Sequence, residues 1–332
     1  MTAPLGALRD HVRRLWPRYP LLPLVPFVAY ALVSAARGGL RVEHVGAVLV
    51  VLGLAYTSPR TKALLVAVYP IALVGLVYDG MRPLQRLGLT PERVHVCDVR
   101  DLEARLFGFA ADGAASHASL PSASGRLTLH DWFATHHSPA LDLLAAFPYA
   151  TFILVSIACA VFLAFEDRAA MTRFTWAFFA LNVLGFVTYH LFPTAPPWYF
   201  HAHGCSVDLT TQASEGPALA RVDAMLGVSY FRGMYSKASS VFGAIPSLHC
   251  AYPFLVVLEG WRSFGPRLRA LSIAYWLLMI FASVYLDHHW LIDGLLGSAY
   301  ALVASLVLRR LLPPARPSER DLPPTGVAAE AE

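Results

Sequence analysis

Two histidines about forty residues apart are the side chains of this sequence best suited to chemistry. His249 ends the sequence Gly-Ala-Ile-Pro-Ser-Leu-His, and His289 stands four residues before Asp293. Four residues of helix advance about 6 Å and return to nearly the same face, so we expect Asp293 to accept a hydrogen bond from Nδ1 of His289. This bond would fix the tautomer and leave Nε2 as a nucleophile that can attack phosphorus and form a phosphohistidine.

His249 is the candidate general acid that protonates the leaving alkoxide, and in the return step the base that activates the acceptor hydroxyl. The two imidazoles are expected to converge across a gap the size of a phosphoryl group. Either histidine could instead simply lie in headgroup water beside Trp290, but ionisable groups near membrane depth are costly and are typically functional. The role of His288, on a different helix face, stays open.

Several groups near the histidines are candidate phosphate ligands. Pro246 suits the first turn of a helix that continues to Trp261, with the Ser247 hydroxyl beside it and unpaired backbone amides that favour an anion. Lys237 and Arg221 are the cations expected to neutralise phosphate charge. Lys237 could equally be an ordinary solvated loop cation.

Two further motifs have structural interpretations. His201, His203 and Cys205 alternate without a fourth ligand, which favours a structural loop over a zinc site. The proline-rich and aromatic stretch 192–200 favours an interfacial anchor over the lip of a lipid cavity. The sequence contains no Walker lysine loop, His-Glu-x-x-His pair or aspartate-rich magnesium motif, so we expect no metal and no cofactor.

The elements that position these residues are expected to be membrane-spanning helices. The chain has 332 residues, of which 56% are hydrophobic and 14% charged, as in polytopic membrane proteins. A helix needs about 20 residues to cross the hydrocarbon. The apolar pattern predicts spans near 20–36, 44–58, 63–80, 143–165, 174–192, 244–261, 268–286 and 289–309. The second is short, and whether it crosses fully stays open.

The charges indicate an orientation. If the N-terminus is cytoplasmic, the short inside loops carry the basic clusters near 60–62, 168–173, 262–269 and 309–316, as the positive-inside rule requires. A turn with Arg37 and Arg41 disagrees. On this topology both histidines face away from the cytoplasm, and Cys97 and Cys205 lie in outside segments where a disulfide is allowed but not required. The weak, scattered net charge of +4 gives no case for nucleic acid.

Two short motifs carry a family resemblance. Pro-Ser-Leu-His at 246–249 and His-Trp-Leu-Ile-Asp at 289–293 resemble the second and third signature motifs of the type 2 phosphatidic acid phosphatase superfamily. Supporting stretches resemble its inositol phosphorylceramide synthase branch, and they lie at 192–199, 218–227, 239–249 and 285–293. The similarity covers about residues 130–300, and more faintly the segment that begins at Asp101.

The resemblance implies a six-helix core around an outward-facing triad of His249, His289 and Asp293, with the later histidine as nucleophile. Two features depart from the family pattern. The arginine of the third motif falls at Ser283, and no first motif precedes Pro193. In phosphatases these cations bind the phosphate, so their absence puts simple phosphatase activity in doubt.

The expected fold is an all-α polytopic bundle, with about two accessory helices before the six-helix core. The expected divisions are a cytoplasmic N-terminus with accessory membrane helices at 1–62, a catalytic membrane domain at 63–312 with extracytoplasmic segments 81–142 and 193–243, and a disordered cytoplasmic tail at 313–332. The arginine-rich, lysine-poor usage indicates a GC-rich bacterial genome, and therefore the bacterial inner membrane.

The expected function is transfer of a phospho head group from a phospholipid donor to a lipid alcohol, through a phosphohistidine. The expected case is phosphoinositol from phosphatidylinositol, with ceramide or diacylglycerol as the acceptor. One alternative is a lipid phosphate phosphatase that uses water as acceptor. An alternative of another class is a catalytically silent lipid-binding or transport protein. The oligomeric state stays open.

Overall fold

The computed structural model describes residues 3–85, 87–110, 125–213, 216–236, 238 and 240–313. The described chain is mostly helical, and it confirms the prediction of an all-α membrane bundle. Five helices are long and apolar enough to cross a membrane. They are α4 (Pro59–Gln85), α7 (Pro139–Glu166), α8 (Arg168–Leu191), α13 (Pro266–Tyr285) and α14 (Leu291–Leu311). The predicted tail beyond residue 313 and the candidate Lys237 lie outside the described residues.

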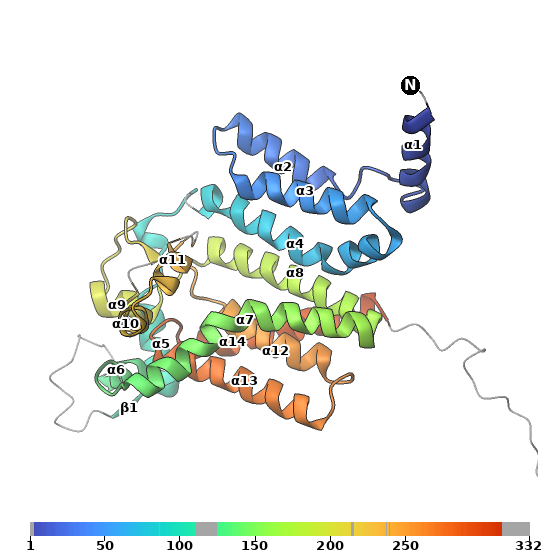
Figure 1. Ribbon diagram of the computed structural model, residues 1–332. Coiled ribbons are helices and arrows are strands. Elements are labelled where there is room, and N and C mark those ends of the chain that lie inside the picture. The colour runs from blue at the N-terminus through green and yellow to red at the C-terminus, as the bar shows by residue number, and fades with distance from the viewer. Residues whose placement is uncertain are drawn as a thin grey trace, which may run out of the picture.

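Three of the predicted spans form shorter apolar helices, which are α2 (Val25–Ala36), α3 (Val42–Tyr56) and α12 (Leu248–Gly260). The prediction that a span begins at 244 is wrong, because Ser247 is the N-cap of α12 and Pro246 lies before it. The residues just before Ser247 form an irregular segment that leads into the start of α12. The first helix, α1 (Ala3–Leu15), lies at the edge of the bundle, where His11 contacts the carbonyl oxygen of Tyr56 at the end of α3 at 2.8 Å (Figure 1).

Helix α12 is the centre of the bundle and packs against α7, α8, α13 and α14. Helix α4 covers α8, and α3 covers α4 in turn, so the N-terminal helices form an outer layer (Figure 1). The buried core between α7, α8, α12 and α14 contains Leu163, Phe174, Leu181, Leu255 and Ala301. Large apolar side chains such as Leu154, Phe165 and Leu271 are exposed on the outside, as a helix surface in contact with lipid requires.

One end of the bundle is tied together by a buried carboxylate. Glu259 of α12 accepts hydrogen bonds from Nε of Arg173 at 3.3 Å and from Nε of Arg309 at 3.1 Å, and it also bonds Ser305. These contacts join α8, α12 and α14. A buried charge at this depth is tolerated because it is paired and hydrogen-bonded.

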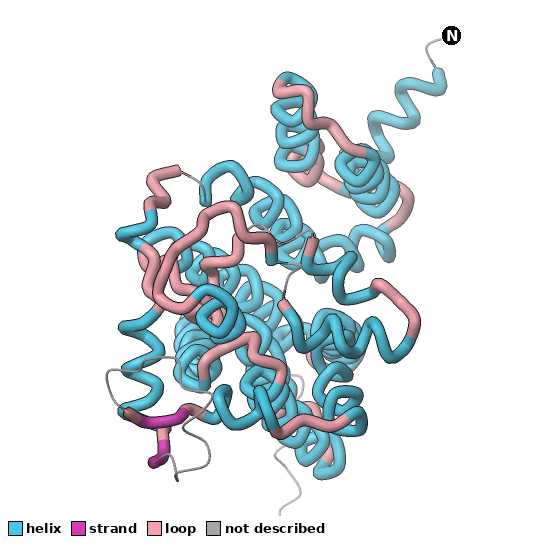
Figure 2. The backbone as a smooth tube through the Cα atoms, turned by 90° about the vertical axis from the view of Figure 1, so that its left-hand side faces the viewer, coloured by secondary structure: helices cyan, strands magenta, loops and turns pink. Residues whose placement is uncertain are grey.

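Short helices and loops gather at the opposite end and form what we call the cap (Figures 1 and 2). The cap contains the 3₁₀ helix η1 (Pro91–Arg93), α5 (Cys97–Phe107), α6 (Leu129–Thr135), α9 (Pro197–His203), α10 (Pro217–Leu226) and α11 (Tyr230–Tyr235). It also contains the antiparallel strands β1 (Phe109–Ala110) and β2 (Arg126–Leu127). A disulfide between Cys97 and Cys205 joins α5 to the loop after α9.

The aromatic residues of α9 form the apolar core of the cap. Trp198, Tyr199 and Phe200 are all buried, and they pack with Val99 and Trp290. The preference for an interfacial anchor at 192–200 is therefore wrong. The prolines end α8 and turn the chain inward, so that the aromatic rings reach the cap core instead of the lipid surface.

Candidate active site

His249 and His289 lie side by side where α12 and α14 begin. His249 is in the first turn of α12, and His289 lies in the turn between α13 and α14. Nδ1 of His249 and Nε2 of His289 are 3.0 Å apart. The two rings converge as the sequence predicted, but the gap is narrower than expected. A direct hydrogen bond leaves no room for phosphorus between these two nitrogens.

The hydrogen bonds assign the protons on the two rings. Nδ1 of His289 lies 3.0 Å from the carbonyl oxygen of Ala244, which can only accept, so Nδ1 carries the proton. In a neutral ring Nε2 of His289 is then an acceptor, and Nδ1 of His249 donates to it. The nitrogen left with a lone pair is the one that faces His249. It is the atom for which the sequence predicts the role of nucleophile, and that role stays a prediction.

Asp293 supports His289 less directly than the four-residue spacing predicted. Its Oδ2 lies 3.5 Å from Nδ1 of His289, and the same oxygen accepts a hydrogen bond from the backbone N–H of Trp290 at 3.0 Å. The expected hydrogen bond from Nδ1 goes to Ala244 instead, because the chain before Pro246 carries that carbonyl onto the ring. Asp293 is fully buried. A carboxylate at this distance can still stabilise positive charge on the imidazole.

Close backbone contact between α12 and α14 fixes the position of His249 relative to His289. The amide of Ser247 donates to the carbonyl oxygen of Asp293 at 3.0 Å. A Cβ atom added at Gly297 would lie 2.1 Å from the carbonyl oxygen of Ser247, a distance that no side chain can occupy. Glycine at 297 is therefore what lets the start of α12 reach α14.

Glu103 of the cap braces the start of α14. Its Oε1 and Oε2 accept hydrogen bonds from the amides of Leu291 at 3.0 Å and Ile292 at 3.1 Å, although these two residues lie far from Glu103 in the sequence. Burial raises the pKa of the Glu103 carboxyl, although its bonds to these amides act in the opposite direction. Together with Asp293, which takes the amide of Trp290, this carboxylate satisfies the first donors of α14.

The structure gives two of the predicted phosphate ligands other partners. Ser247 is fully buried, and as the N-cap residue of α12 its hydroxyl oxygen accepts a hydrogen bond from the amide of Cys250. Arg221 of α10 forms an ion pair with Asp142 of α7, with Nη2 and Oδ1 2.9 Å apart. Both side chains are therefore used to hold helices in place. The third predicted ligand, Lys237, is not among the described residues.

A network of charged residues in the cap holds the turn that carries His289. Nδ1 of His201 lies 2.6 Å from Asp287, and its Nε2 lies 3.1 Å from Asp131, which also pairs with Arg100. Burial opposes charge on His201, but its bonds to the two aspartates prevail and raise its pKa to about 10. Asp287 itself has a positive φ of 62°. This ion-paired network therefore fixes an unusual turn next to His289.

These contacts also decide the interpretation of the His201, His203 and Cys205 motif. Cys205 is in the disulfide, His201 lies between two aspartates, and His203 stacks on Tyr199. The three side chains have separate partners and do not converge as zinc ligands, so the structural interpretation agrees with the contacts.

Sequence reasoning missed Glu103, Gly297 and the pairing of His201 with Asp287. The segment that begins at Asp101 carries only a faint family resemblance, which gives its glutamate no role. A buried acid in a polar segment gives no local signal of a partner 188 residues away. His288, whose role was open, lies in the turn with its ring between those of Tyr149 and Tyr235.

Comparison with known proteins finds a family and curated relatives. A model of the PAP2 superfamily matches residues 124–307. The chain is 32% identical over 291 residues to phosphoinositol dihydroceramide synthase of Bacteroides thetaiotaomicron. The aligned region covers 86% of this chain and 90% of that protein. It is 33% identical over 176 residues to inositol phosphorylceramide synthase of Candida albicans, which covers 52% of this chain and 37% of that protein.

The match to the catalytic subunit of inositol phosphorylceramide synthase of Saccharomyces cerevisiae is 33% identical over 178 residues, which is 53% of this chain and 44% of that protein. The chain thus spans less than half the length of these fungal relatives. No solved structure matches the chain.

Proposed function

This chain belongs to the PAP2 superfamily, in its inositol phosphorylceramide synthase-like branch, and on that premise we propose that it transfers phosphoinositol from phosphatidylinositol to ceramide or a similar lipid alcohol. It is an integral membrane phosphotransferase acting on lipids. The observation that carries the finer proposal is the direct contact of His249 with the lone-pair nitrogen of His289, 3.0 Å away. The pair supplies a nucleophile and a proton carrier that can both reach one phosphorus atom once the two rings separate.

In the first step Nε2 of His289 attacks the phosphorus of the donor, and the bond from phosphorus to the diacylglycerol oxygen breaks. His249, as the imidazolium, gives its proton to that oxygen, and diacylglycerol leaves. In the second step the acceptor hydroxyl gives its proton to neutral His249, and its oxygen attacks phosphorus. The bond from phosphorus to Nε2 then breaks, which restores both histidines.

The resting hydrogen bond between the two rings has a consequence for donor binding. The phosphate cannot enter between nitrogens 3.0 Å apart, so we expect the His249 ring to turn away from His289 when the donor binds. His249 is half-buried and lies against the rings of Tyr149 and Phe152, whereas Nδ1 of His289 is anchored on Ala244. The proton carrier is therefore the ring that moves, and the nucleophile is the ring that stays.

We expect the N-terminus of α12 to help neutralise the charge of the phosphate. Phosphoryl transfer depends mainly on positioning and on charge neutralisation. The first amides of α14 are already taken by Glu103 and Asp293. At the N-terminus of α12 the amides of Ser247 and Cys250 have partners, so we expect the phosphate to meet the end of the helix dipole beside His249.

The proposal places the cap and the site on the non-cytoplasmic side of the bacterial inner membrane. The Cys97–Cys205 disulfide lies in the cap, and disulfides persist in oxidising compartments. The basic loops lie at the other end, where α7 joins α8, where α12 joins α13 and where α14 ends. Both features support the same orientation.

The test is a transfer assay with purified protein, phosphatidylinositol labelled in the inositol ring, and ceramide. We expect label to move into a new inositol phospholipid. His289→Ala should abolish the transfer while the protein keeps its helical circular dichroism spectrum, and His137→Ala, at an exposed cap histidine, should be fully active. Release of water-soluble inositol phosphate without a new lipid would show that water, and not a lipid alcohol, is the acceptor. Retained transfer by His289→Ala would reject the mechanism.

A further inference from the structure

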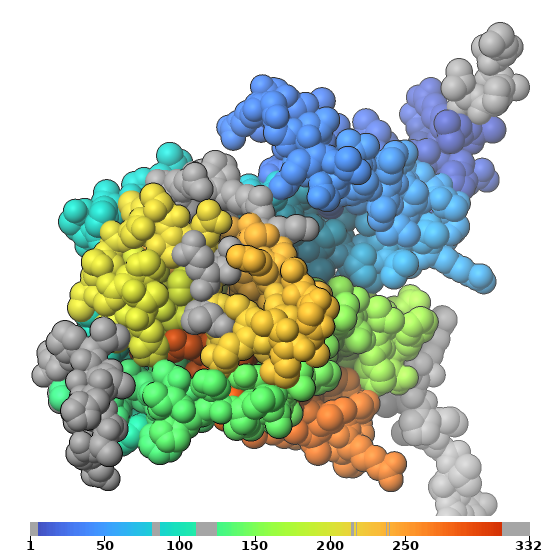
Figure 3. Space-filling view, turned by 60° about the vertical axis from the view of Figure 1, so that its left-hand side comes forward, coloured from blue at the N-terminus to red at the C-terminus, as the bar shows by residue number. Residues whose placement is uncertain are grey.

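A cavity of about 450 Å³ lies in the cap beside the catalytic turn. Helices α10 and α11 form most of its wall, and His288 and Gly216 complete it. In the space-filling view, orange-red atoms, the colour of the chain near α14, are visible between the yellow and green surfaces (Figure 3). Small-molecule sites commonly have volumes of about 300 to 1,000 Å³, so the cavity is large enough for a lipid head group.

A stack of rings connects the cavity wall to the catalytic pair. The His288 ring lies between those of Tyr149 and Tyr235, with centroid distances of 5.1 Å and 4.9 Å. The Tyr149 ring also contacts the His249 ring at 4.8 Å. His288 itself precedes the nucleophile by one residue. A group bound against His288 is therefore a near neighbour of a phosphate held at His289.

The edges of these rings carry polar atoms with no partner. Nε2 of His288 and the hydroxyl of Tyr235 are buried and have no hydrogen-bond partner among the described residues. His288 is only 7% exposed. Buried polar groups are nearly always paired, and each exception calls for a missing ligand or water. Both of these residues line the cavity.

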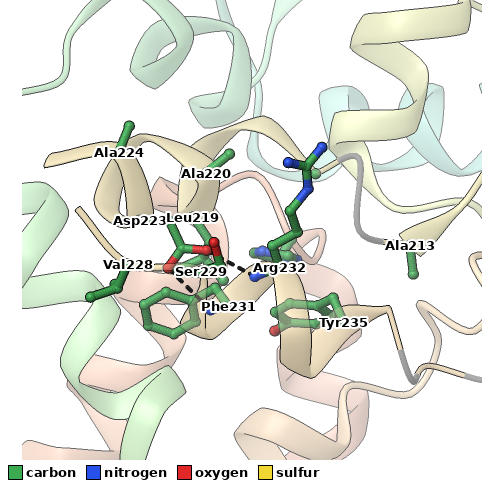
Figure 4. Close-up of a pocket in the computed structure, with 12 residues that line it drawn as sticks. Ala213, Leu219, Ala220, Asp223, Ala224, Val228, Ser229, Phe231, Arg232 and Tyr235 are labelled. Carbon is green, nitrogen blue, oxygen red and sulfur yellow. Dashed lines mark hydrogen bonds between the residues drawn. The ribbon is translucent and has the colours of Figure 1, made fainter. Parts of the chain in front are cut away.

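The charged residues of the cavity have other positions or partners. The carboxylate of Asp223 accepts the amides of Phe231 at 3.1 Å and Arg232 at 2.9 Å, and so it holds the start of α11 (Figure 4). The Arg232 side chain extends away from Tyr235 (Figure 4). What this part of the wall offers a ligand is therefore a pair of neutral groups.

We propose that this cavity binds the polyol ring of the donor head group, with Tyr235 and His288 hydrogen-bonding its hydroxyls. The inference rests on the proposed function, because it places the inositol next to the phosphate that His289 attacks. A tyrosine hydroxyl and a neutral imidazole can each donate or accept, which matches neighbouring hydroxyls of a polyol.

The test compares Tyr235→Phe with the matched control Tyr230→Phe on the same helix. Tyr230 donates to the carbonyl oxygen of Ala150 and does not line the cavity. Because the Tyr235 hydroxyl has no described partner, its removal should leave the thermal midpoint unchanged. We expect Tyr235→Phe to raise KM for phosphatidylinositol about threefold to tenfold, the range for one lost hydrogen bond. KM for ceramide and kcat should stay constant, and the inhibition constant of glycerophosphoinositol should rise by the same factor as KM.

The outcomes separate this inference from the proposed function. A wild-type protein that uses phosphatidylinositol, with Tyr235→Phe unchanged in KM and inhibition constant, would reject the polyol site alone. A wild-type protein that transfers nothing from phosphatidylinositol would reject the proposed function and this inference with it. Transfer from phosphatidylcholine that Tyr235→Phe weakens would show that the cavity binds an amine head group and would overturn the polyol assignment.

Discussion

Substitution of Gly297 by alanine should slow turnover strongly, because this position sets the distance between α12 and α14. The added Cβ would lie 2.1 Å from the carbonyl oxygen of Ser247. A carbon and an oxygen approach no closer than about 3.3 Å in ordinary contacts, so the start of α12 must move by about 1.2 Å. Ser247 caps α12 only two residues before His249. A misplacement of about 1 Å at a reacting group costs on the order of 100-fold in rate.

The matched control for this substitution is Gly75→Ala in α4, where an added Cβ meets nothing within 4 Å. Alanine there should stabilise the helix by up to about 1 kcal/mol, whereas overpacking at Gly297 should cost about 1 to 3 kcal/mol. The measurements are kcat for inositol transfer in mixed micelles and the thermal midpoint by circular dichroism. A folded Gly297→Ala protein with the turnover of the wild type would show that the contact between α12 and α14 does not position the histidines.

Three further predictions concern the cap. Glu103→Ala leaves two buried amides of α14 unpaired, so it should lower stability by about 1 to 3 kcal/mol per amide and also lower kcat; an unchanged melting curve would contradict the bracing role. Burial opposes the charge of His201, but bonds to two aspartates raise its pKa to about 10 from 6.5, so its stabilisation is complete below pH 6.5 and lost as the pH rises through 10. The thermal midpoint should fall over that window in the wild type and less in His201→Gln; equal slopes would argue against the pairing. Cys97→Ser with Cys205→Ser opens a link over 108 residues and should cost about 2 to 5 kcal/mol, and identical mobility of reduced and oxidised protein on a denaturing gel would contradict the disulfide.

The parts of the account that depend on local pattern could be predicted from the sequence. Runs of apolar residues predicted the five long helices, because about 20 such residues are needed to cross the bilayer. The four-residue spacing of His289 and Asp293 predicted that the two groups lie close together, although His289 stands in the turn before α14 and not in the helix. The convergence of His249 with His289 followed from the family resemblance together with their positions at the mouths of neighbouring segments.

The remaining features depend on contacts between distant parts of the chain. The carbonyl oxygen that accepts the hydrogen bond from Nδ1 of His289 belongs to Ala244. This residue lies on an irregular segment whose path no periodicity predicts. The sequence predicts Arg221 as a phosphate ligand, but in the fold its guanidinium group lies 2.9 Å from the carboxylate of Asp142 and forms an ion pair with it. Glu103 reaches α14 only because the cap folds back over the bundle. Such pairings are set by tertiary structure and not by local propensity.

Isolation of the covalent enzyme intermediate would decide whether His289 is the nucleophile. Purified protein is mixed with inositol-labelled phosphatidylinositol without acceptor, quenched in alkali and digested, since a phosphohistidine is stable in base and labile in acid. We expect label on the peptide that contains His289, its discharge into lipid when ceramide is added, and no label in His289→Ala. Steady transfer to ceramide without labelled enzyme, or label on another residue, would contradict the account.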